Sequence, residues 1–205
     1  MGALGDKGAP LARLQRAYRF LRPVLFHSPY EAAAAFVIGH RISVRQGRAI
    51  RQRLAQEHGD QIRVGDDVFH AFPRPQVLRA LPGVAGVSPM KIPRLHAIAD
   101  AALDGWLDRA ALRGMPEDAA LAKLRSLPGI GAFFSQAILY RGAGLADAVT
   151  DDEMTRKAFQ KAFTLPRLPD RETMLALAEP WRPYRMWATV LLHVSLRREQ
   201  EDTRA

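Results

Sequence analysis

The 205-residue chain contains no cysteine. Disulfides, thiolate zinc sites and cysteine-ligated iron–sulfur clusters are therefore excluded as sources of stability or chemistry. Long apolar runs are also lacking, because the longest, Ala32–Gly39, is far shorter than the ~20 residues that a membrane-spanning helix needs. No basic, apolar and small-residue sequence typical of a secretion signal opens the chain. We therefore expect a cytoplasmic location and no membrane partner.

Acidic residues are scarce relative to basic ones. The sequence has 21 Asp and Glu against 30 Lys and Arg, which gives a net charge of +9 and an isoelectric point near 10.6. The six histidines show no spacing typical of metal ligands. A strongly basic chain favours a polyanionic partner, although charge alone does not define its specificity. The length is sufficient for one or two lobes with a hydrophobic core.

Helical periodicity dominates the sequence, and no segment requires a large sheet. Ser28 has the features of an N-cap residue, because Pro29 follows it and Glu31 completes a capping box. A small β-hairpin is expected over 62–69, around Gly65-Asp66. Residues 81–86 (LPGVAG) are a near copy of LPGIG at residues 127–131 but are interpreted as a plain loop. Apolar spacing predicts helices over 11–21, 32–38, 44–58, 75–81, 93–107, 117–126, 132–141, 150–163, 171–178 and 181–198.

This pattern predicts an all-α fold of two helical lobes with a cleft between them. Residues 1–10 are rich in glycine and are expected to form a flexible arm. The core is expected over 11–198, with one lobe at about 22–110 and the other at about 111–198. Residues 199–205 form a charged tail.

A short hairpin motif, LPGIG at Leu127–Gly131, joins two of the predicted helices. Pro128 ends the first helix because its ring clashes with the preceding turn. Gly129 and Gly131 permit unusual dihedrals and leave no side chain in the way. The helix that begins near Ala132 has N-terminal N–H groups without intrahelical partners. Such a helix end attracts a phosphate oxygen.

The hairpin and an aspartate some twenty residues later together resemble the helix-hairpin-helix DNA glycosylases, in particular their 3-methyladenine DNA glycosylase II branch. The resemblance covers roughly residues 22 to 197. It is carried by LPGIG, by Asp147–Asp152 (DAVTDD), by Trp181–Arg185 (WRPYR), and by Ser28–Glu31 (SPYE) before a helix ending in IGHRISV. It implies this superfamily's fold without the N-terminal β domain of its longer members. It also implies a monomer that acts on double-stranded DNA, in the nucleoid, without a required cofactor.

Asp152 matches the catalytic carboxylate of that family. Cleavage of a purine N-glycosidic bond develops positive charge on the sugar, and a fixed carboxylate can stabilise that charge or deprotonate the attacking water. The alternative is that Asp152 only complements a helix dipole. Under either interpretation, Thr150–Glu153 matches a capping box, so Thr150 should be the N-cap and Asp152 the second helical residue. Asp151 is the adjacent alternative for catalysis, and Asp147 is expected to cap.

Phe133 occupies the position at which bifunctional relatives carry a Schiff-base lysine. Phenylalanine cannot form an imine, so the resemblance implies a monofunctional glycosylase without lyase activity. Helical spacing places Phe133, Gln136, Ala137 and Tyr140 on one face, which is the expected base pocket. The alternative is that these aromatic residues belong to the core.

Several positions depart from the family pattern. His40 and Arg41 stand where relatives have the side chains that fill the space of a flipped nucleotide, and Arg41 could instead bind phosphate. Ala137, Glu153 and Ser195 replace aromatic residues that stack on an electron-poor base. The sequence therefore also allows a non-catalytic binder of damaged or bent DNA, or a glycosylase for a deaminated base.

The remaining expectations concern DNA contacts and bound ions. Gly129, Ile130, Gly131, Ala132 and Lys123 are expected to contact phosphate. The family hairpin often holds Na⁺ or K⁺ on backbone carbonyls, which here would be those of Arg125, Leu127 and Ile130. His193 is interpreted as a satisfied core residue, and Arg182 and Arg185 as ligands of DNA or of carboxylates. We predict that the chain hydrolyses the N-glycosidic bond of a flipped-out, alkylated purine.

Overall fold

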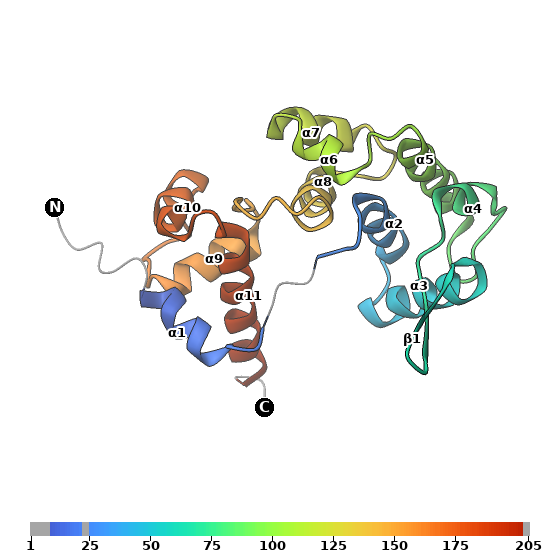
Figure 1. Ribbon diagram of the computed structural model, residues 1–205. Helices are drawn as coiled ribbons and strands as arrows, with labels where there is room; N and C mark the ends of the chain where they lie inside the picture. The colour runs from blue at the N-terminus through green and yellow to red at the C-terminus, as the bar shows by residue number, and fades with distance from the viewer. Residues whose placement is uncertain (1–8, 22–24, 203–205) are drawn as a thin grey trace. The chain divides into compact units, whose positions relative to one another are not determined.

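The computed structural model describes residues 9–21 and 25–202 of the chain, and Figure 1 shows its helical composition. Two compact units divide the chain: residues 1–24 with 145–205, and residues 25–144. This division differs from the lobes predicted at about 22–110 and 111–198. The hairpin at 127–131 belongs to one unit and Asp152 to the other. Most of the predicted N-terminal arm, at residues 1–8, lies outside the described residues.

The unit of residues 25–144 is a set of helices with one small β-hairpin. Its strands β1 (Gln61–Val64) and β2 (Asp67–His70) pair antiparallel, with Ile62 opposite Phe69, which confirms the predicted hairpin. Residues 81–86 form a loop, as expected. The helices are α2 (Pro29–Gly39), α3 (Val44–His58), α4 (Pro75–Ala80), η1 (Pro89–Lys91), α5 (Ile92–Leu103), α6 (Arg109–Arg113), α7 (Glu117–Arg125), α8 (Ala132–Ala137) and η2 (Ile138–Gly142).

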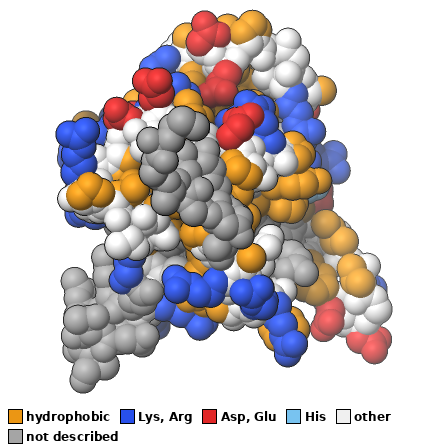
Figure 2. Space-filling model, turned by 90° about the vertical axis from the view of Figure 1, so that its left-hand side faces the viewer, with side chains coloured by type: hydrophobic (Ala, Val, Ile, Leu, Met, Phe, Trp, Pro, Cys, Tyr) orange, Lys and Arg blue, Asp and Glu red, His pale blue; other side chains and the backbone are white. Residues whose placement is uncertain are grey.

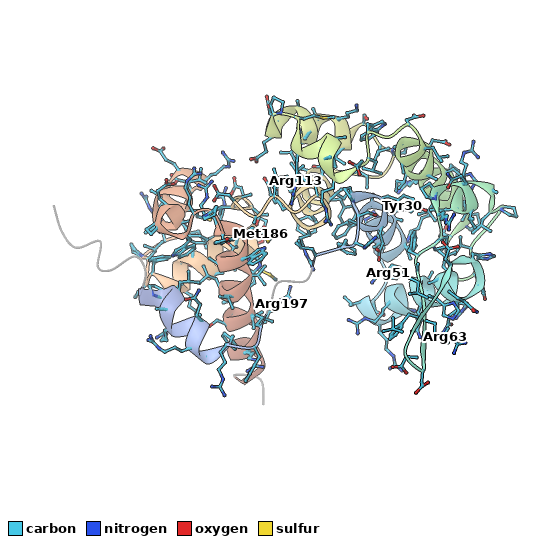
Figure 3. All side chains as sticks on the ribbon, in the orientation of Figure 1. Tyr30, Arg51, Arg63, Arg113, Met186 and Arg197 are labelled. Carbon is cyan, nitrogen blue, oxygen red and sulfur yellow. The ribbon has the colours of Figure 1, made fainter. Side chains whose placement is uncertain are left out.

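Helix α2 is the buried centre of this unit. Its alanines Ala32, Ala33 and Ala34 are fully buried, and α3, α5 and η2 pack around it. Tyr30 is labelled on α2 in Figure 3, and its hydroxyl donates to the Pro73 carbonyl over 2.9 Å. Burial raises the pKa of Tyr30, and the nearby Glu31 carboxylate raises it further. The small side chains of α2 allow neighbouring backbones to approach closely.

The start of α2 follows its sequence. Ser28 is the N-cap, its hydroxyl accepts from the Glu31 backbone N–H over 3.1 Å, and Pro29 is at the first helical position. A reciprocal capping box is present at α3, where Ser43 and Gln46 each accept from the other's backbone N–H. These contacts satisfy N–H groups that a helix start otherwise leaves without partners.

The helix predicted over 132–141 changes its hydrogen-bond pattern halfway. After α8, the Ala143 N–H donates to the Ile138 carbonyl over 3.0 Å, which makes η2 a π-helical turn. Helix α6, which the sequence analysis does not predict, holds the end of this turn. Arg113, labelled in Figure 3, donates to the carbonyls of Ala143 and Gly144 over 2.6 and 2.8 Å. The π turn is therefore fixed by side chains from a separate helix.

The other unit contains α1 (Ala9–Ala17), α9 (Glu153–Ala162), α10 (Arg171–Ala178), η3 (Glu179–Trp181) and α11 (Arg185–Asp202). Its core joins Leu14 of α1, Phe159 of α9, Met174 of α10 and Leu192 of α11. The rings of Phe159, Phe163 and Trp181 pack on one another with centroids 5.5 to 5.9 Å apart. Trp181 is buried in this core.

Several predicted helix ends differ from the structure. The first helix spans 9–17 instead of 11–21, the helix expected to reach 107 ends at Leu103, and α9 begins at Glu153. The last helix begins at Arg185, because Pro183 cannot donate the backbone hydrogen bond that a continuous helix from Trp181 would need. It continues to Asp202, into the predicted tail, and residues 203–205 lie outside the described residues.

The predicted all-α class is confirmed, with the β-hairpin as a minor addition. Within the part of the chain that the structure describes, no helix has the length and apolar character to cross a membrane. Basic, acidic and hydrophobic side chains are interspersed on the face shown in Figure 2. The positive charge is therefore not confined to one segment of that face.

We predict that Gly142→Ala destabilises the fold. An added Cβ would lie 2.9 Å from the Pro29 Cα and 3.0 Å from the Ala32 Cβ, where α2 and η2 touch. Overpacking of this kind costs about 1–3 kcal/mol of the free energy of unfolding, measurable by urea denaturation. Gly39→Ala is the control, because nothing lies within 4 Å of its added Cβ. Equal stability of the two variants would contradict the close approach.

Candidate active site

The hairpin between α7 and α8 has the conformation that its glycines permit. Gly129 has φ +86°, and the Ile130 N–H donates to the Leu127 carbonyl over 3.1 Å. Ile130 is buried and anchors the turn, whereas Gly129, Gly131 and Ala132 are exposed. Gly131 is the N-cap of α8 and offers no side-chain acceptor to the first N–H groups of the helix. Those donors remain available to an external acceptor.

The two hairpin glycines have different requirements. At Gly129 an added Cβ would lie 2.8 Å from the Arg94 Cδ, and the positive φ would strain any larger residue. At Gly131 nothing lies within 4 Å of an added Cβ, so the space in front of this backbone is open. An anion could therefore approach the backbone at Gly131 more closely than at Gly129.

The charged and carbonyl groups near the hairpin already have partners. The Lys123 ammonium lies 4.9 Å from the centroid of the Trp106 ring, a cation–π distance. The Arg125 guanidinium donates to the Leu121 carbonyl of its own helix. The Leu127 carbonyl, one of the expected cation ligands, accepts the Ile130 N–H and retains a second lone pair. The cation site at Arg125, Leu127 and Ile130 stays a prediction.

The four residues predicted to line a base pocket differ in exposure. Phe133 is 61% exposed, and Gln136 and Ala137 are half-buried. Tyr140 is buried, and its hydroxyl donates to the Glu117 Oε1 over 2.7 Å, so this ring packs in the core of its unit. The neighbouring Phe134 stacks on Phe36 with centroids 5.1 Å apart. Phe133 is thus the aromatic ring of this helix that is available to a ligand.

The loop between α2 and α3 holds Arg41 in an uncommon conformation. Arg41 has φ +58° and is exposed, whereas the His40 ring packs edge-on against Phe134 at 5.7 Å. The Lys91 ammonium fastens the loop by donating to the carbonyls of Ile38 and His40 over 2.9 and 2.7 Å. Burial lowers the pKa of Lys91, and Arg94 lowers it further. A left-handed arginine costs of order 1–3 kcal/mol, and such strain is concentrated at functional sites.

Asp152 begins α9 as its N-cap residue, which corrects the expectation that Thr150 has this role. The Asp152 Oδ1 accepts from the Thr155 N–H over 2.9 Å, and its Oδ2 accepts from the Thr155 hydroxyl over 2.8 Å. Asp152 is therefore outside the helix instead of at its second position. Each carboxylate oxygen keeps a further lone pair, so the cap leaves acceptor sites for other chemistry.

The Thr155 hydroxyl connects Asp152 to two further side chains. It lies 2.7 Å from the Thr150 Oγ1 and 3.1 Å from the His193 Nε2, which belongs to α11. Thr155 is fully buried, and His193 is half-buried. The carboxylate is thus at the edge of a polar cluster between α9 and α11.

The pKa of Asp152 is lowered from its ordinary value. Burial is the largest single influence and raises the pKa. Hydrogen bonds from the Thr155 N–H and from the hydroxyls of Thr150 and Thr155, together with the nearby His193, lower it by more in sum. The carboxyl group is therefore ionised at neutral pH.

The segment before Asp152 is fixed by an ion pair instead of a cap. Arg185 is buried and donates to both oxygens of Asp147, over 2.6 and 3.1 Å, and to the Asp147 backbone carbonyl. Arg182 adds a contact of 2.6 Å to the same carboxylate. The expectation that Asp147 caps a helix is therefore wrong. Arg182 and Arg185 pair with a carboxylate, which confirms one of the two roles expected of them. Asp151 pairs with Arg156 and is exposed.

A depression of about 240 Å³ is lined by residues of α9 and α11, namely Glu153, Met154, Lys157, Leu196 and Arg197. Met154 and Arg197 are in contact across it, with the Arg197 Nη2 3.7 Å from the methionine sulfur. Figure 3 labels Arg197 on α11. Among the described residues, no group of three or more His, Asp or Glu side chains is arranged to hold a metal ion.

Sequence reasoning did not identify Thr155 and Lys91 as contributors. Thr155 follows Asp152 at a spacing that suits an aspartate cap, but the overlapping Thr150–Glu153 box gave an equally good match. No local sequence pattern indicates the role of Lys91, because the carbonyls to which it donates, those of Ile38 and His40, are some fifty residues away in the chain. His193 has a hydrogen-bond partner, as expected of a satisfied core residue. That partner is the Thr155 hydroxyl, which also contacts Asp152.

Solved structures share this fold. The chain has the fold of the helix-hairpin-helix DNA glycosylases, which confirms the resemblance seen in its sequence. The 3-methyladenine DNA glycosylase of Archaeoglobus fulgidus superposes with a TM-score of 0.72 and 22% identity, over 94% of this chain and 67% of that one. The Schizosaccharomyces pombe 3-methyladenine DNA glycosylase Mag1, in complex with abasic DNA, gives 0.64 and 23%, over 93% and 91%.

Similar sequences carry names of DNA repair proteins. A putative DNA-3-methyladenine glycosylase of Bacillus subtilis, YfjP, is 24% identical over 84% of this chain. The probable bifunctional transcriptional activator and DNA repair enzyme AlkA of Mycobacterium tuberculosis is 26% identical over 81% of this chain. The chain spans 61% of the first of these proteins and 33% of the second. No family model matches the sequence.

We predict that Asp147→Asn destabilises the unit that contains Asp152. The substitution removes the carboxylate that lies 2.6 Å from the Arg185 guanidinium, whose side chain is 9% exposed, and leaves it the longer ion pair of 3.6 Å to Glu179. Loss of one partner of a largely buried pair costs roughly 2–4 kcal/mol of the free energy of unfolding. Asp151→Asn is the matched control, because its partner Arg156 is 38% exposed and such a pair contributes less than about 1 kcal/mol. Urea denaturation of both variants measures the difference, and equal losses would refute it.

Proposed function

We propose that the protein is a monofunctional DNA glycosylase that hydrolyses the N-glycosidic bond of a damaged, alkylated purine, with Asp152 as its catalytic carboxylate. The observation that carries the proposal is the ionised, half-buried Asp152 on the fold of the helix-hairpin-helix glycosylases. The names of the related proteins from Bacillus subtilis and Archaeoglobus fulgidus support a 3-methyladenine-type activity.

The chemistry of the carboxylate suits this reaction. Departure of the base leaves positive charge on the sugar, and a carboxylate held by hydrogen bonds stabilises that charge without reorganising. The same group can accept a proton from the attacking water. Its two bonds to Thr155 fix its orientation, and its lowered pKa keeps it charged at neutral pH.

The hairpin supplies a site for the DNA backbone. Exposed N–H groups at the start of α8 have no side-chain cap, and the space in front of Gly131 is open. A phosphate oxygen would accept from these donors and lie at the positive end of the helix dipole. The net charge of +9 favours the same polyanionic partner, double-stranded DNA.

Phe133 supports hydrolysis without strand cleavage. A lyase step needs an amine to form an imine with the sugar, and a phenyl ring supplies none. The exposed ring can instead stack on an extruded base. The product of the proposed reaction is therefore an intact strand with an abasic site.

Arg41 is the residue that we propose as the wedge for the space left by the flipped nucleotide. It is exposed and held in a left-handed conformation by a loop that Lys91 fastens, whereas His40 packs against Phe134. The flat guanidinium can stack between bases as well as bind phosphate. The hydrogen bonds from Lys91 to the Ile38 and His40 carbonyls would hold the loop in place when the Arg41 side chain enters the duplex.

We expect Asp152→Asn to reduce base release by roughly 10²–10⁴-fold in single-turnover assays, because it removes the charge that the transition state requires. Asparagine is an equally good N-cap, so folding and DNA affinity should be retained. The matched control is Asp151→Asn, which should keep its activity. Undiminished turnover by Asp152→Asn, or loss confined to Asp151→Asn, would refute the assignment.

A panel of duplexes with alkylated, deaminated or oxidised bases separates this function from its alternatives. The proposal expects abasic sites in the alkylated duplexes. Abasic sites confined to hypoxanthine or uracil duplexes would instead establish a glycosylase for deaminated bases. Tight binding of damaged or bent DNA with no abasic product from any duplex would establish a non-catalytic binder, the alternative that the departures at Ala137, Glu153 and Ser195 favour.

For the wedge, we expect Arg41→Ala to slow base release about tenfold at saturating enzyme and to reduce flipping, reported by 2-aminopurine fluorescence beside the lesion. Arg45→Ala is the control, because Arg45 is an exposed arginine one turn away on α3. Loss of the Arg45 side chain should weaken DNA affinity and lower the salt dependence of binding, without slowing base release from the bound complex. If Arg41→Ala behaves as Arg45→Ala does, Arg41 is a phosphate ligand and not a wedge.

A further inference from the structure

Two helices of the same unit begin with the same aspartate–threonine cap. In α9 the Thr155 N–H donates to Asp152 over 2.9 Å, and in α10 the Thr173 N–H donates to Asp170 over 2.8 Å. The pKa of each aspartate is lowered by hydrogen bonds from the backbone and hydroxyl of its threonine, although burial raises that of Asp152. The caps differ in their surroundings, because Thr155 is fully buried beside His193 and Thr173 is exposed. An ordinary cap therefore needs neither the burial nor the histidine.

The hydrogen atoms around the Thr155 hydroxyl can be assigned. A hydroxyl has one hydrogen and two lone pairs, and three polar atoms lie around this one. They are the Asp152 Oδ2 at 2.8 Å, the Thr150 Oγ1 at 2.7 Å and the His193 Nε2 at 3.1 Å. An ionised carboxylate can only accept, so the single Thr155 hydrogen goes to Asp152. His193 must then donate to the Thr155 oxygen. The Thr150 hydroxyl has one hydrogen, which it donates either to the Thr155 oxygen or to the Asp152 carboxylate.

We propose that His193 is a positioning residue for Asp152: its Nε2–H donates to the Thr155 hydroxyl, which commits the only hydrogen of that hydroxyl to the carboxylate. Without this donor, the Thr155 hydroxyl could turn toward another acceptor. With it, the Thr155 oxygen accepts from His193 and the hydrogen of the hydroxyl is directed at the carboxylate. The consequence for the reaction rests on the proposed function, whereas the hydrogen-bond assignment does not.

The charges around His193 are few. Burial is the main influence on its pKa and lowers it; the Asp152 carboxylate raises it, and Arg197, one turn further along α11, lowers it. Of the other elements that pack on α11, α9 also carries Glu153 and Lys157, which pair with each other, Arg156, which pairs with Asp151, and Lys161. Helix α1 carries Arg13 and Arg16. On η3, Glu179 pairs with Arg182 and Arg185. None of these groups is among those that shift the pKa of His193.

The test is a carboxyl-carbon NMR titration of Asp152 in the wild-type chain and in two variants, with Asp170 as the internal control. His193→Phe removes the donor, and we expect the pKa of Asp152 to rise by roughly half a unit to one unit. His193→Gln keeps an N–H donor but not the positive charge of a protonated imidazole, and it should remain near the wild-type value. Asp170 should not move in either variant.

The His193→Gln variant separates two explanations. If it shifts Asp152 as much as His193→Phe does, the histidine acts by its charge through space and the proposal is refuted. An unchanged Asp152 titration in His193→Phe refutes it as well. A double-mutant cycle with Thr155→Val gives an independent measurement. In the Thr155→Val background, His193→Phe should no longer shift the pKa of Asp152. A shift of the same size with and without Thr155→Val would show that His193 does not act through Thr155.

Base release supplies the link to function. In His193→Phe the acid limb of the single-turnover pH–rate profile should move upward by the same shift as the Asp152 titration, and His193→Gln should restore it. An acid limb that stays in place while the titration moves would show that the network does not serve the reaction. If the wild-type chain released no base from any duplex, the proposed function would fail while the titrations would still decide the hydrogen-bond assignment.

Discussion

The site depends on how a charged carboxylate is held in a place that water only partly reaches. Burial raises the pKa of Asp152, and the donors directed at the carboxylate more than offset that effect, so the pKa lies below its ordinary value. The Thr155 N–H and hydroxyl are those donors, and the start of α9 fixes both. The helix needs an acceptor at its first turn and the carboxylate needs donors, so one arrangement satisfies both requirements. Capping and catalysis are therefore compatible roles for this residue.

The same logic explains the segment that leads to Asp152. A loop before a helix has few backbone partners of its own, and here Arg185 holds it by donating to the Asp147 carboxylate and carbonyl. The Met186 N–H donates to the Ala146 carbonyl and ties the loop to the start of α11. Because α11 also carries His193, one helix positions the loop, the threonine network and thereby the carboxylate. A rigid helix is a more accurate support for such a group than a loop.

Much of this arrangement could be predicted from the sequence where the signals are local. The helix α3, the hairpin β1–β2 and the cap at Ser28 follow from periodicity, turn residues and a proline at the first helical position. Misjudged features have partners far along the chain or compete with an equally good local pattern. Thr150 and Asp152 both match an N-cap, and only the buried position of Thr155 decides between them. Tyr140 shares a helix face with Phe133, and that spacing does not indicate its bond to Glu117, 23 residues away in the chain; its place in a base pocket stays a prediction.

The hairpin and the carboxylate place different demands on the sequence. The hairpin offers backbone N–H groups, so it requires two glycines and a buried Ile130 but no particular polar side chain. The carboxylate requires a specific set of side chains, of which His193 is the most distant in sequence. A chain can therefore keep the hairpin while many of its side chains change, which agrees with a shared fold at 22–23% identity. Differences between related proteins in the chemistry of the carboxylate should then arise from residues such as His193, which touch the carboxylate only through another side chain.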